Sequence, residues 1–318
     1  MKVLANDGIS KTTKKTLEDA GIEILDQRVA QEHLARIMNE NNVDVLLVKN
    51  ATKVSRQLID AVPSLKIIGK AGEGWDNVDV SYAQEKGISM ISAPEGLSRS
   101  AAEMVFAHFL SLARFLHESN RMMPLEGESQ FNALKRSYGN AVELQGKTLG
   151  VIGLGHVGKE VVKIGISLGM NVKAFTRTPK TEKLTLRFFD GQTLDFSLHT
   201  TNDWDEFLNG TQFISINTTK TSEYIIGLPQ LEKMENGVYI VNTVSGGIDE
   251  VALLDFVESG KVAGAALDIF ENEPHPELNI LMNPALSLSP HLAGTTLDAQ
   301  EKTDAALAQQ IINLKNHY

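Results

Sequence analysis

Short apolar runs alternate along the chain with longer amphipathic stretches, and many of the runs end near glycine, asparagine or proline. This alternation is typical of parallel strands joined by crossover helices, because such strands are buried on both faces. The pattern therefore predicts an α/β protein. In the first third of the chain it predicts four strands of a first sheet, at residues 3–5, 43–48, 65–68 and 89–91.

A second series of apolar runs follows a predicted connecting helix at residues 101–115. Its six strands are predicted at residues 148–152, 171–175, 213–216, 238–241, 263–267 and 285–288. Six strands suffice for a complete dinucleotide-binding fold. Between residues 184 and 199, polar and apolar residues alternate around Asp190-Gly191. This predicts an inserted β-hairpin, because Asp-Gly favours a tight turn.

Length, composition and charge narrow the possible functions. A chain of 318 residues favours two domains. Its composition, with 42% hydrophobic and 22% charged residues, is that of a globular protein that folds fully. The net charge of -10 repels nucleic-acid backbones and anionic membranes. The absence of cysteine excludes disulfides and thiolate metal sites and is compatible with a reducing compartment. With no signal peptide or membrane span in the pattern, we expect a cytoplasmic protein without metal.

A glycine-rich turn opens the second series of strands. The pattern Gly-x-Gly-x-x-Gly is formed by Gly153, Gly155 and Gly158, with His156 and Val157 before the last glycine. It follows an apolar strand and precedes a helix predicted at residues 159–168. In that context the glycines permit a tight turn, the approach of backbone amides to a pyrophosphate, and close helix packing. The turn predicts a dinucleotide site at a helix amino terminus; the alternative is an ordinary strand-turn-helix corner.

The end of the next strand indicates which dinucleotide is bound. About 20 residues after the glycines, NAD-binding folds carry an acidic residue that binds the adenosine ribose. This chain has Thr176, Arg177, Thr178 and Lys180 there instead. Without a carboxylate, a ribose phosphate is not repelled, and Arg177 with Lys180 can bind it. The sequence therefore favours NADP over NAD, with a solvated basic turn as the alternative.

Several further segments share the sequence pattern of one enzyme family. They are residues 64–69, 71–80, 93–96, 101–103 and 259–268, Phe270, Glu273-Pro274 and Ser289-Pro290-His291. Together with the glycine turn, they resemble the D-isomer-specific 2-hydroxyacid dehydrogenases, especially the short-type D-3-phosphoglycerate dehydrogenases. The similarity extends over nearly the whole chain.

This resemblance implies two doubly wound parallel-sheet domains with the active site between them. A flavodoxin-like substrate or lid domain would comprise residues 1–97 and 292–318, and a central Rossmann dinucleotide-binding domain residues 98–291. The resemblance also implies an oxidoreductase that transfers a hydride between a nicotinamide cofactor and a small anionic D-2-hydroxy or 2-keto acid. It further implies a homodimer formed mainly through the cofactor domain.

His291 and Glu273 are the predicted catalytic pair. Hydride transfer at a 2-hydroxy acid needs a group that exchanges a proton with the substrate oxygen, and histidine titrates in the useful range. The resemblance assigns that role to His291, which also borders the cofactor, and assigns to Glu273 the carboxylate that favours its imidazolium form. It assigns Asp268, at an expected strand end, to the nicotinamide carboxamide. The alternative roles are a loop end for Glu273 and caps for the other two.

The expected substrate site lies in the loop at residues 71–80. In the resembled family its backbone amides hold the substrate carboxylate, which here points to Ala71, Gly72, Glu73 and Gly74. Glu73 stands where a small or apolar residue is usual, so its carboxylate either opposes the substrate or points to solvent. Lys49 matches a position that is often arginine, and it either reaches an anionic group of the substrate or is an ordinary surface lysine.

Two segments depart from the family pattern. In the segment at residues 242–247, Thr243 is expected beside the cofactor, but Ser245 stands where the family has an arginine on the substrate. A serine supplies no bidentate cation, and losing a charged hydrogen bond to a developing oxyanion commonly costs about 3 kcal/mol, roughly a hundredfold in rate. Asn217 and Thr218, also expected at the cofactor, belong to a stretch that replaces a common His-Val-Pro. Two hypotheses therefore remain: an oxidoreductase with weakened or retargeted chemistry, and a catalytically silent nucleotide-binding paralogue.

Overall fold

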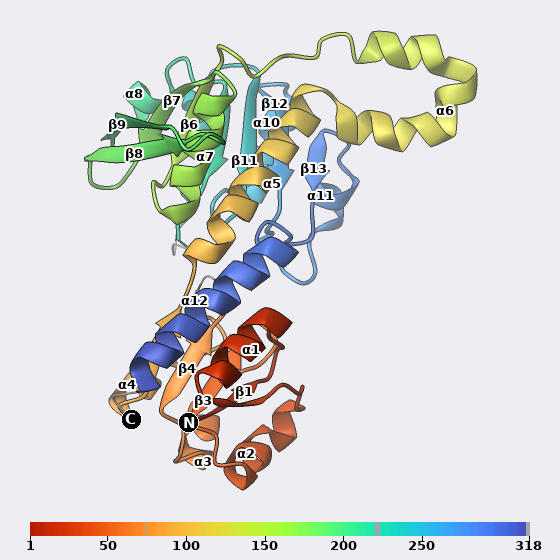
Figure 1. Cartoon of the computed structure of the whole chain (residues 1–318). Helices are drawn as coiled ribbons and strands as arrows, with labels where there is room; N and C mark the ends of the chain where they lie inside the picture. The colour runs from red at the N-terminus through yellow and green to blue at the C-terminus, as the bar shows by residue number, and fades with distance from the viewer. Residues whose placement is uncertain (73, 220–222, 316–318) are drawn as a thin grey trace. The chain divides into compact units, whose positions relative to one another are not determined.

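The computed structural model describes residues 1–72, 74–219 and 223–315 (Figure 1). The chain divides into two compact units. Unit 1 contains Met1–Ser98 and the chain from Gly294 onward, and unit 2 contains Arg99–Ala293. Each unit is built on its own sheet with helices between the strands, which confirms the predicted α/β class.

Unit 1 contains a five-stranded parallel sheet in the order β2-β1-β3-β4-β5. Its strands are β1 Lys2–Ala5, β2 Glu23–Leu25, β3 Val45–Val48, β4 Ile67–Lys70 and β5 Ser89–Ser92. This order is that of the flavodoxin-like doubly wound sheet. The sequence did not predict β2, because its three residues are only partly buried and form no long apolar run.

Helices cover both faces of this sheet, and the carboxy-terminal helix belongs to the same unit. They are α1 Lys11–Asp19, α2 Gln31–Glu40, α3 Arg56–Ala61, α4 Val80–Glu85 and α12 Leu297–Lys315. Ser10 caps α1 and Asp79 caps α4 by accepting a hydrogen bond from a backbone amide in the first turn. Leu307 and Ile311 of α12 join Leu17 of α1 in one buried apolar cluster. The end of the chain therefore completes the core that its beginning starts.

Unit 2 contains an eight-stranded sheet in the order β13-β12-β11-β10-β6-β7-β9-β8. Its strands are β6 Thr148–Ile152, β7 Asn171–Phe175, β8 Thr181–Arg187, β9 Thr193–Thr201, β10 Phe213–Ile216, β11 Val238–Asn242, β12 Val262–Leu267 and β13 Leu286–Leu288. All neighbours run parallel except β8, which is antiparallel to β9. The strand order reverses at β6, as in a Rossmann fold. All six predicted strands are present.

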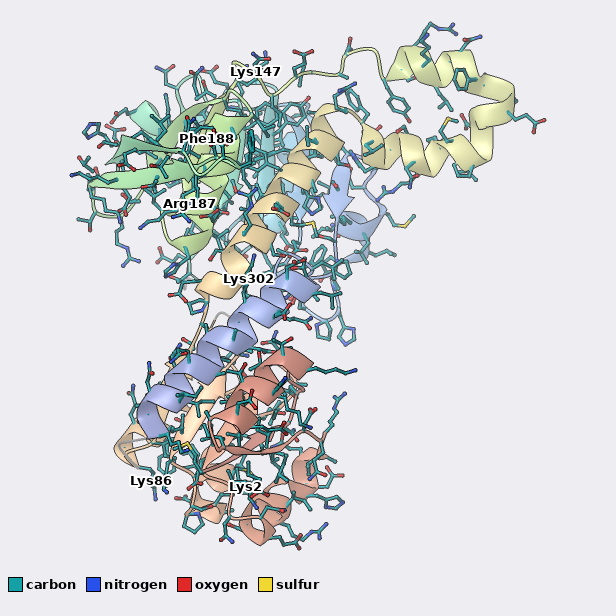
Figure 2. The ribbon with its side chains drawn as sticks, viewed as in Figure 1. Lys2, Lys86, Lys147, Arg187, Phe188 and Lys302 are labelled. Carbon is teal, nitrogen blue, oxygen red and sulfur yellow. The ribbon has the colours of Figure 1, made fainter. Side chains whose placement is uncertain are left out.

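The predicted hairpin is also present, but its second strand is part of the main sheet. The hairpin turns at Asp190-Gly191, and Leu184 faces Phe196 across it. The last residues of β9 then pair in parallel with β7, so β9 serves as the third strand of the Rossmann half. A β-hairpin strand thus stands where a crossover helix normally joins two such strands. The turn begins at the half-exposed Phe188 (Figure 2).

The helices of unit 2 include the two long ones that follow β5. The helices are α5 Glu95–Ala113, α6 Leu116–Ser137, α7 His156–Ser167, α8 Trp204–Leu208, α9 Leu228–Lys233, α10 Glu250–Glu258 and α11 Leu278–Met282. Helix α5, whose first residues lie in unit 1, starts earlier than the predicted connecting helix and ends before Phe115, which has a left-handed φ of 52°. Phe109 of α5 packs edge-on against Phe213 of β10 in the core. Within the described ranges, no helix is long and apolar enough to cross a bilayer.

Candidate active site

The carboxyl ends of six parallel strands in unit 2 meet at one edge of the sheet. Strand register places Ile152 beside both Phe175 and Ile216, and Asn242 beside both Ile216 and Leu267. Ligands of open α/β sheets bind outside this edge. The residues that directly follow the strands are Gly153, Thr176, Asn217, Thr243, Asp268 and Ser289. All of them lie in segments that the sequence marked as functional.

The glycine turn is shaped by close backbone contacts. Gly153 has a φ of +87°, and a Cβ atom there would lie 2.8 Å from the carbonyl oxygen of Asn217. A Cβ atom on Gly158 would lie 2.0 Å from the carbonyl oxygen of Gly153, so only glycine lets α7 approach the turn. The position of Gly155 is different, because a Cβ atom there would meet no atom within 4 Å.

The amino terminus of α7 fits a pyrophosphate. Gly155 is the N-cap, His156 and Val157 begin the helix, and no side chain in the described ranges caps its first turn. The first amides of a helix have no acceptor within the helix, and they attract anions together with the helix dipole. Open space at Gly155 leaves room for such an anion. The residues present therefore fit the dinucleotide that the pattern predicted.

The turn after β7 is held against β9 and displays basic side chains. Thr176 donates its amide to the carbonyl of Thr201, and its hydroxyl lies 2.6 Å from that of Thr200. The Thr200 hydroxyl also accepts a hydrogen bond from the amide of Lys180. Arg177 and Thr178 are exposed on this turn, and Arg177 makes no hydrogen bond or ion pair with the described residues.

Lys180 has a partner that the sequence did not reveal. Glu182, on β8, binds Lys159 of α7 at 2.5 Å and Lys180 at 2.8 Å. Hydrogen bonds from these two lysines lower the pKa of Glu182. Because Lys159 lies in the first turns of α7, this cluster joins the hairpin to the helix that begins at the glycine turn.

On the other side of β6, the ends of β10 and β11 present short polar side chains. The amide group of Asn217 binds the hydroxyl of Ser215, and both side chains are buried. Thr218 donates its hydroxyl to the carbonyl of Thr219, and Thr243 donates its hydroxyl to the carbonyl of Ile216. The Thr243 hydroxyl thereby joins the ends of β10 and β11, the two strands next to the glycine turn on this side.

Ser245 lies in a tight turn that Asn242 organises. The Asn242 side chain accepts a hydrogen bond from the amide of Val244 and donates one to its carbonyl. A Cβ atom on Gly247 would lie 2.2 Å from the Asn242 side-chain oxygen, so the turn closes tightly. Ser245 is half-buried, and its hydroxyl has no hydrogen-bond partner among the described residues.

The predicted catalytic pair is formed. The Nδ1 atom of His291 lies 3.0 Å from Oε2 of Glu273, and Oε1 of Glu273 accepts a hydrogen bond from the amide of Phe270. The anchored carboxylate fixes the Nδ1–H tautomer of the neutral imidazole, which leaves Nε2 as the atom that can exchange a proton. The His291 side chain is 51% exposed, so it is accessible within unit 2.

Asp268 is buried beneath this histidine. Its backbone carbonyl accepts the amide of His291, and its carboxylate accepts the Ser289 hydroxyl and the amides of Leu292 and Ala293. The side chain is 0% exposed. The carboxylate therefore holds the segment that carries His291, a function that the sequence did not reveal. Its assignment to the nicotinamide carboxamide stays a prediction.

A second buried carboxylate lies where α10 begins. Glu250 and Glu271 each accept the other's backbone amide at Oε1, and Glu250 is almost fully buried. Burial raises the pKa of Glu250 to about 7, and the neighbouring charges of Glu271 and Glu273 act in the same direction. This pair could not be predicted from the sequence, because Glu250 begins α10 whereas Glu271 lies in the loop after β12.

The predicted substrate residues lie at the corresponding edge of the sheet in unit 1. Lys49 follows β3, and Ala71 follows β4. Gly72 and Gly74 both have positive φ angles, of 135° and 72°. Glu73 lies outside the described residues.

Lys70, at the end of β4, binds the segment that follows β3 at this edge of unit 1. Its ammonium group donates to the carbonyl of Lys49 and to the side-chain oxygen of Asn50, both at 2.5 Å. The Lys70 side chain is almost fully buried, and burial lowers its pKa.

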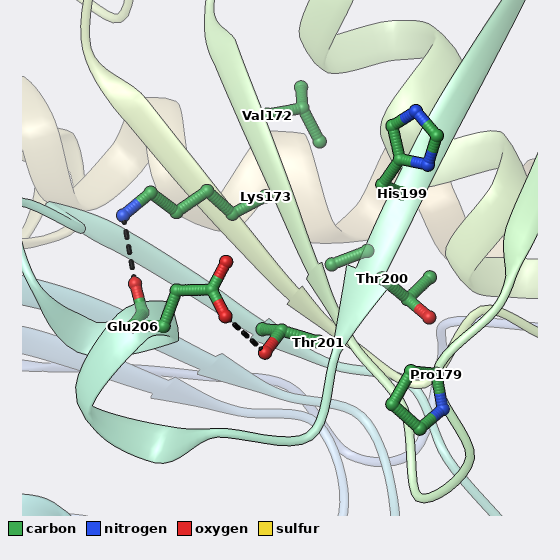
Figure 3. Close-up of a pocket in the computed structure, with 8 residues that line it drawn as sticks. Val172, Lys173, Pro179, His199, Thr200, Thr201 and Glu206 are labelled. Carbon is green, nitrogen blue, oxygen red and sulfur yellow. Dashed lines mark hydrogen bonds between the residues drawn. The ribbon is translucent and has the colours of Figure 1, made fainter.

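A small cavity of about 230 Å³ lies between β7, β9 and α8 (Figure 3). None of the sequence-predicted site residues lines it. Its polar groups bind one another: Lys173 donates to the carbonyl of Glu206, and Thr201 donates to the Glu206 carboxylate. Nothing in this cavity indicates a ligand. In the described part of the chain, no cluster of three or more histidine or acidic side chains could hold a metal ion.

Comparison with known proteins agrees with this geometry. Residues 106–293 match the family model "D-isomer specific 2-hydroxyacid dehydrogenase, NAD binding domain". The chain is 36% identical to a D-3-phosphoglycerate dehydrogenase of Archaeoglobus fulgidus, over 99% of this chain and 57% of that protein. It is 35% identical to a hydroxypyruvate reductase of Thermotoga maritima, over 98% of this chain and 97% of that protein.

Solved structures share the fold. A glyoxylate reductase from Paecilomyes thermophila superimposes with a TM-score of 0.78 at 26% identity, over 98% of this chain and 94% of that one. The chain spans little more than half the length of the phosphoglycerate dehydrogenase, but nearly all of the two reductases.

Proposed function

Because the chain belongs to the D-isomer specific 2-hydroxyacid dehydrogenase family, we propose that it interconverts a small D-2-hydroxy acid and its 2-keto acid with a nicotinamide dinucleotide. The observation that carries this proposal is the His291–Glu273 pair, at the sheet edge that also carries the glycine turn. The relatives named for phosphoglycerate, hydroxypyruvate and glyoxylate support a small anionic substrate.

The bound nicotinamide would supply or accept the hydride. The chain's own residues would provide orientation and the proton. The amide groups at the start of α7 and the open space at Gly155 would hold the pyrophosphate. Nε2 of His291 would give a proton to the substrate oxygen during reduction and take it back during oxidation, while Glu273 stabilises the imidazolium form. Lys49 and the amides at Ala71, Gly72 and Gly74 would hold the substrate carboxylate.

The proposal includes NADP as the favoured cofactor. No carboxylate directly follows β7, and the exposed Arg177 has no partner among the described residues, so it is available to a ribose phosphate. Glu182 is acidic, but two lysines neutralise its charge. Michaelis constants measured for NADPH and NADH test this part, and a strong preference for NADH would contradict it.

We also propose that the protein is a cytoplasmic homodimer. The apolar residues Leu116, Leu125 and Phe131 on α6 are each more than half exposed, and contact with a second copy would bury them. The absence of cysteine is compatible with a reducing compartment. Sedimentation equilibrium tests the dimer, and a monomer at micromolar concentration would contradict it.

The proposed activity is tested with the purified 318-residue chain, NADPH or NADH, and a panel of 2-keto acids that includes glyoxylate and hydroxypyruvate. Oxidation of the reduced cofactor is followed by absorbance. We expect turnover that His291→Ala lowers by about two to four orders of magnitude, because the proton donor is lost. His199→Ala is the matched control, since His199 is an exposed histidine on the hairpin whose side chain, among the described residues, hydrogen-bonds only to Thr181. Tight cofactor binding without consumption of any 2-keto acid would overturn the proposed activity.

One observation favours the alternative, a nucleotide-binding protein without turnover. Ser245 stands where the family pattern has an arginine, and its hydroxyl has no partner among the described residues. Ser245→Arg therefore discriminates between a weakened enzyme and a decayed site. A weakened enzyme gains rate on ordinary 2-keto acids, up to about a hundredfold, because the cation is restored. An unchanged or lower rate would show that Ser245 is not a simple replacement for the arginine.

A further inference from the structure

A chain of buried polar side chains connects α5 with the segment that carries His291. His108 on α5 lies between two serines, with Nδ1 2.9 Å from the Ser287 hydroxyl and Nε2 2.9 Å from the Ser289 hydroxyl. Ser289 is in turn 2.5 Å from Oδ1 of Asp268. Each of these four side chains is at least nine-tenths buried. No sequence motif indicated a function for His108, Ser287 or Ser289 individually.

The chemistry of these groups fixes the direction of each hydrogen bond. A carboxylate only accepts hydrogen bonds, so Ser289 must donate its single proton to Asp268. The Ser289 oxygen can then only accept from His108, which places a proton on Nε2. Burial lowers the pKa of His108, so the ring is neutral and its Nδ1 accepts the proton of Ser287. Each of the three hydrogen bonds between these side chains therefore joins one donor to one acceptor.

Asp268 connects these hydrogen bonds to residues 291–293, the turn that carries His291. It binds the amides of three consecutive residues: His291 through the backbone carbonyl, at 2.8 Å, and Leu292 and Ala293 through the carboxylate, at 2.8 and 2.9 Å. His291 has a φ of 55°, which non-glycine residues rarely adopt without support from their surroundings. The buried carboxylate supplies that support. Its own orientation depends on the bond from Ser289.

We propose that His108 is a positioning residue for the proton transfer at His291. In its Nε2–H form it holds Ser289, and Ser289 holds the carboxylate that anchors the turn. This inference rests on the proposed function, since it concerns the same proton transfer. Positioning matters because a displacement of about 1 Å can cost on the order of a hundredfold in rate. His108 itself would touch neither substrate nor cofactor.

The first test removes the donor. For His108→Leu we expect kcat to fall about tenfold or more, with the KM values for 2-keto acid and cofactor within about twofold of wild type. His108→Gln keeps an N–H group and should retain more of the rate. The control is His117→Leu, because His117 hydrogen-bonds the carbonyls of Ser111 and Pro284 and shares no hydrogen bond with His108, Ser289 or Asp268. A kcat equal to that of wild type in His108→Leu would overturn the proposal.

A second variant guards against misfolding. Ser289→Ala removes the same link by deleting one oxygen atom. If His108 acts through Ser289, the double variant that carries His108→Leu and Ser289→Ala is no slower than the slower of the two single variants, because both substitutions break the same series of hydrogen bonds. Independent effects that multiply would contradict this route.

Two measurements on the folded 318-residue protein do not depend on turnover. Long-range ¹⁵N NMR should show the Nε2–H form of His108, and finding the Nδ1–H form would overturn the inference. Hydrogen exchange of the amides at residues 291–293 should become faster in His108→Leu but not in His117→Leu. If the wild-type protein consumes no 2-keto acid, the proposed function fails, while these two readouts still decide whether His108 holds the turn.

Discussion

The two ends of the candidate site lie on one sheet edge but are held by different interactions. At β12 and β13, Asp268 and Ser289 are buried and bind the turn that carries His291 through short hydrogen bonds. At β7 and β8, the basic turn is exposed, and Glu182 holds its lysines in ion pairs near the surface. Breaking buried hydrogen bonds is costly, whereas surface ion pairs contribute little. The segment that carries His291, the proposed acid/base group, is therefore strongly held, and cofactor preference can change at small cost to the fold.

The largest effect is expected from Asp268→Ala. It leaves a buried hydroxyl, the buried amide of Ala293 and the partly buried amide of Leu292 without their acceptor, each at a cost of roughly 1 kcal/mol, so we expect a loss of about 3 kcal/mol of unfolding free energy. The matched control is Asp195→Ala on the hairpin, an exposed aspartate bound by Thr185, which should change stability by less than about 0.5 kcal/mol. Urea unfolding measures both. Equal losses would remove the contrast between the two ends.

A pH-dependent effect is expected at Glu250. Its pKa is raised to about 7 in the folded chain, from 4.5, so folding favours its protonated form. The contribution of Glu250 to stability is therefore present below about pH 4.5 and is lost as the pH rises to about 7. Glu250→Gln mimics the protonated side chain and should gain up to about 3 kcal/mol above pH 7. The gain should vanish below pH 4.5, and unfolding titrations across this range measure it. A gain independent of pH would show that the Glu250 charge is not its cause.

A smaller effect is expected at the exposed end of the site. Arg177→Gln removes the cation proposed for the ribose phosphate, so the dissociation constant of NADPH should rise about tenfold. That of NADH should stay unchanged. Fluorescence titration of both cofactors measures the change without requiring turnover. Equal weakening of the two cofactors would mean that Arg177 binds a group that they share.

The smallest effect is expected from Glu182→Gln. Releasing Lys159 and Lys180 from their common partner adds positive charge near the ribose, so NADPH affinity should rise about threefold at low salt. The difference should shrink in 1 M salt because of screening. Asp195→Asn is the control on the same hairpin. Weaker NADPH binding in Glu182→Gln would instead show that the glutamate orients the lysines for the phosphate.

The site could be predicted from sequence wherever its signal was local. The glycine turn places three residues within one strand-turn-helix corner, and the His291–Glu273 pair followed from the family pattern. The Lys159–Glu182–Lys180 cluster could not be predicted, because it joins a helix to a hairpin strand. The ion pair of Lys180 with Glu182 could not be predicted for the same reason, and binding of a ribose phosphate by Lys180 stays a prediction. His108 also gave no signal, since its partners lie 179 and 181 residues away.

The sequence by itself determined the α/β class, the six expected strands of the second sheet and the glycine turn, because the burial pattern and turn chemistry of each are written in neighbouring residues. Only the tertiary structure decided that β9 is a strand of the main sheet and that α12 completes the first core. It alone decided that Asp268 anchors the turn that carries His291. Those features depend on contacts between segments that are far apart in the sequence. Such contacts form only when the whole chain has folded, because the order of the strands and the burial of side chains then decide which segments become neighbours.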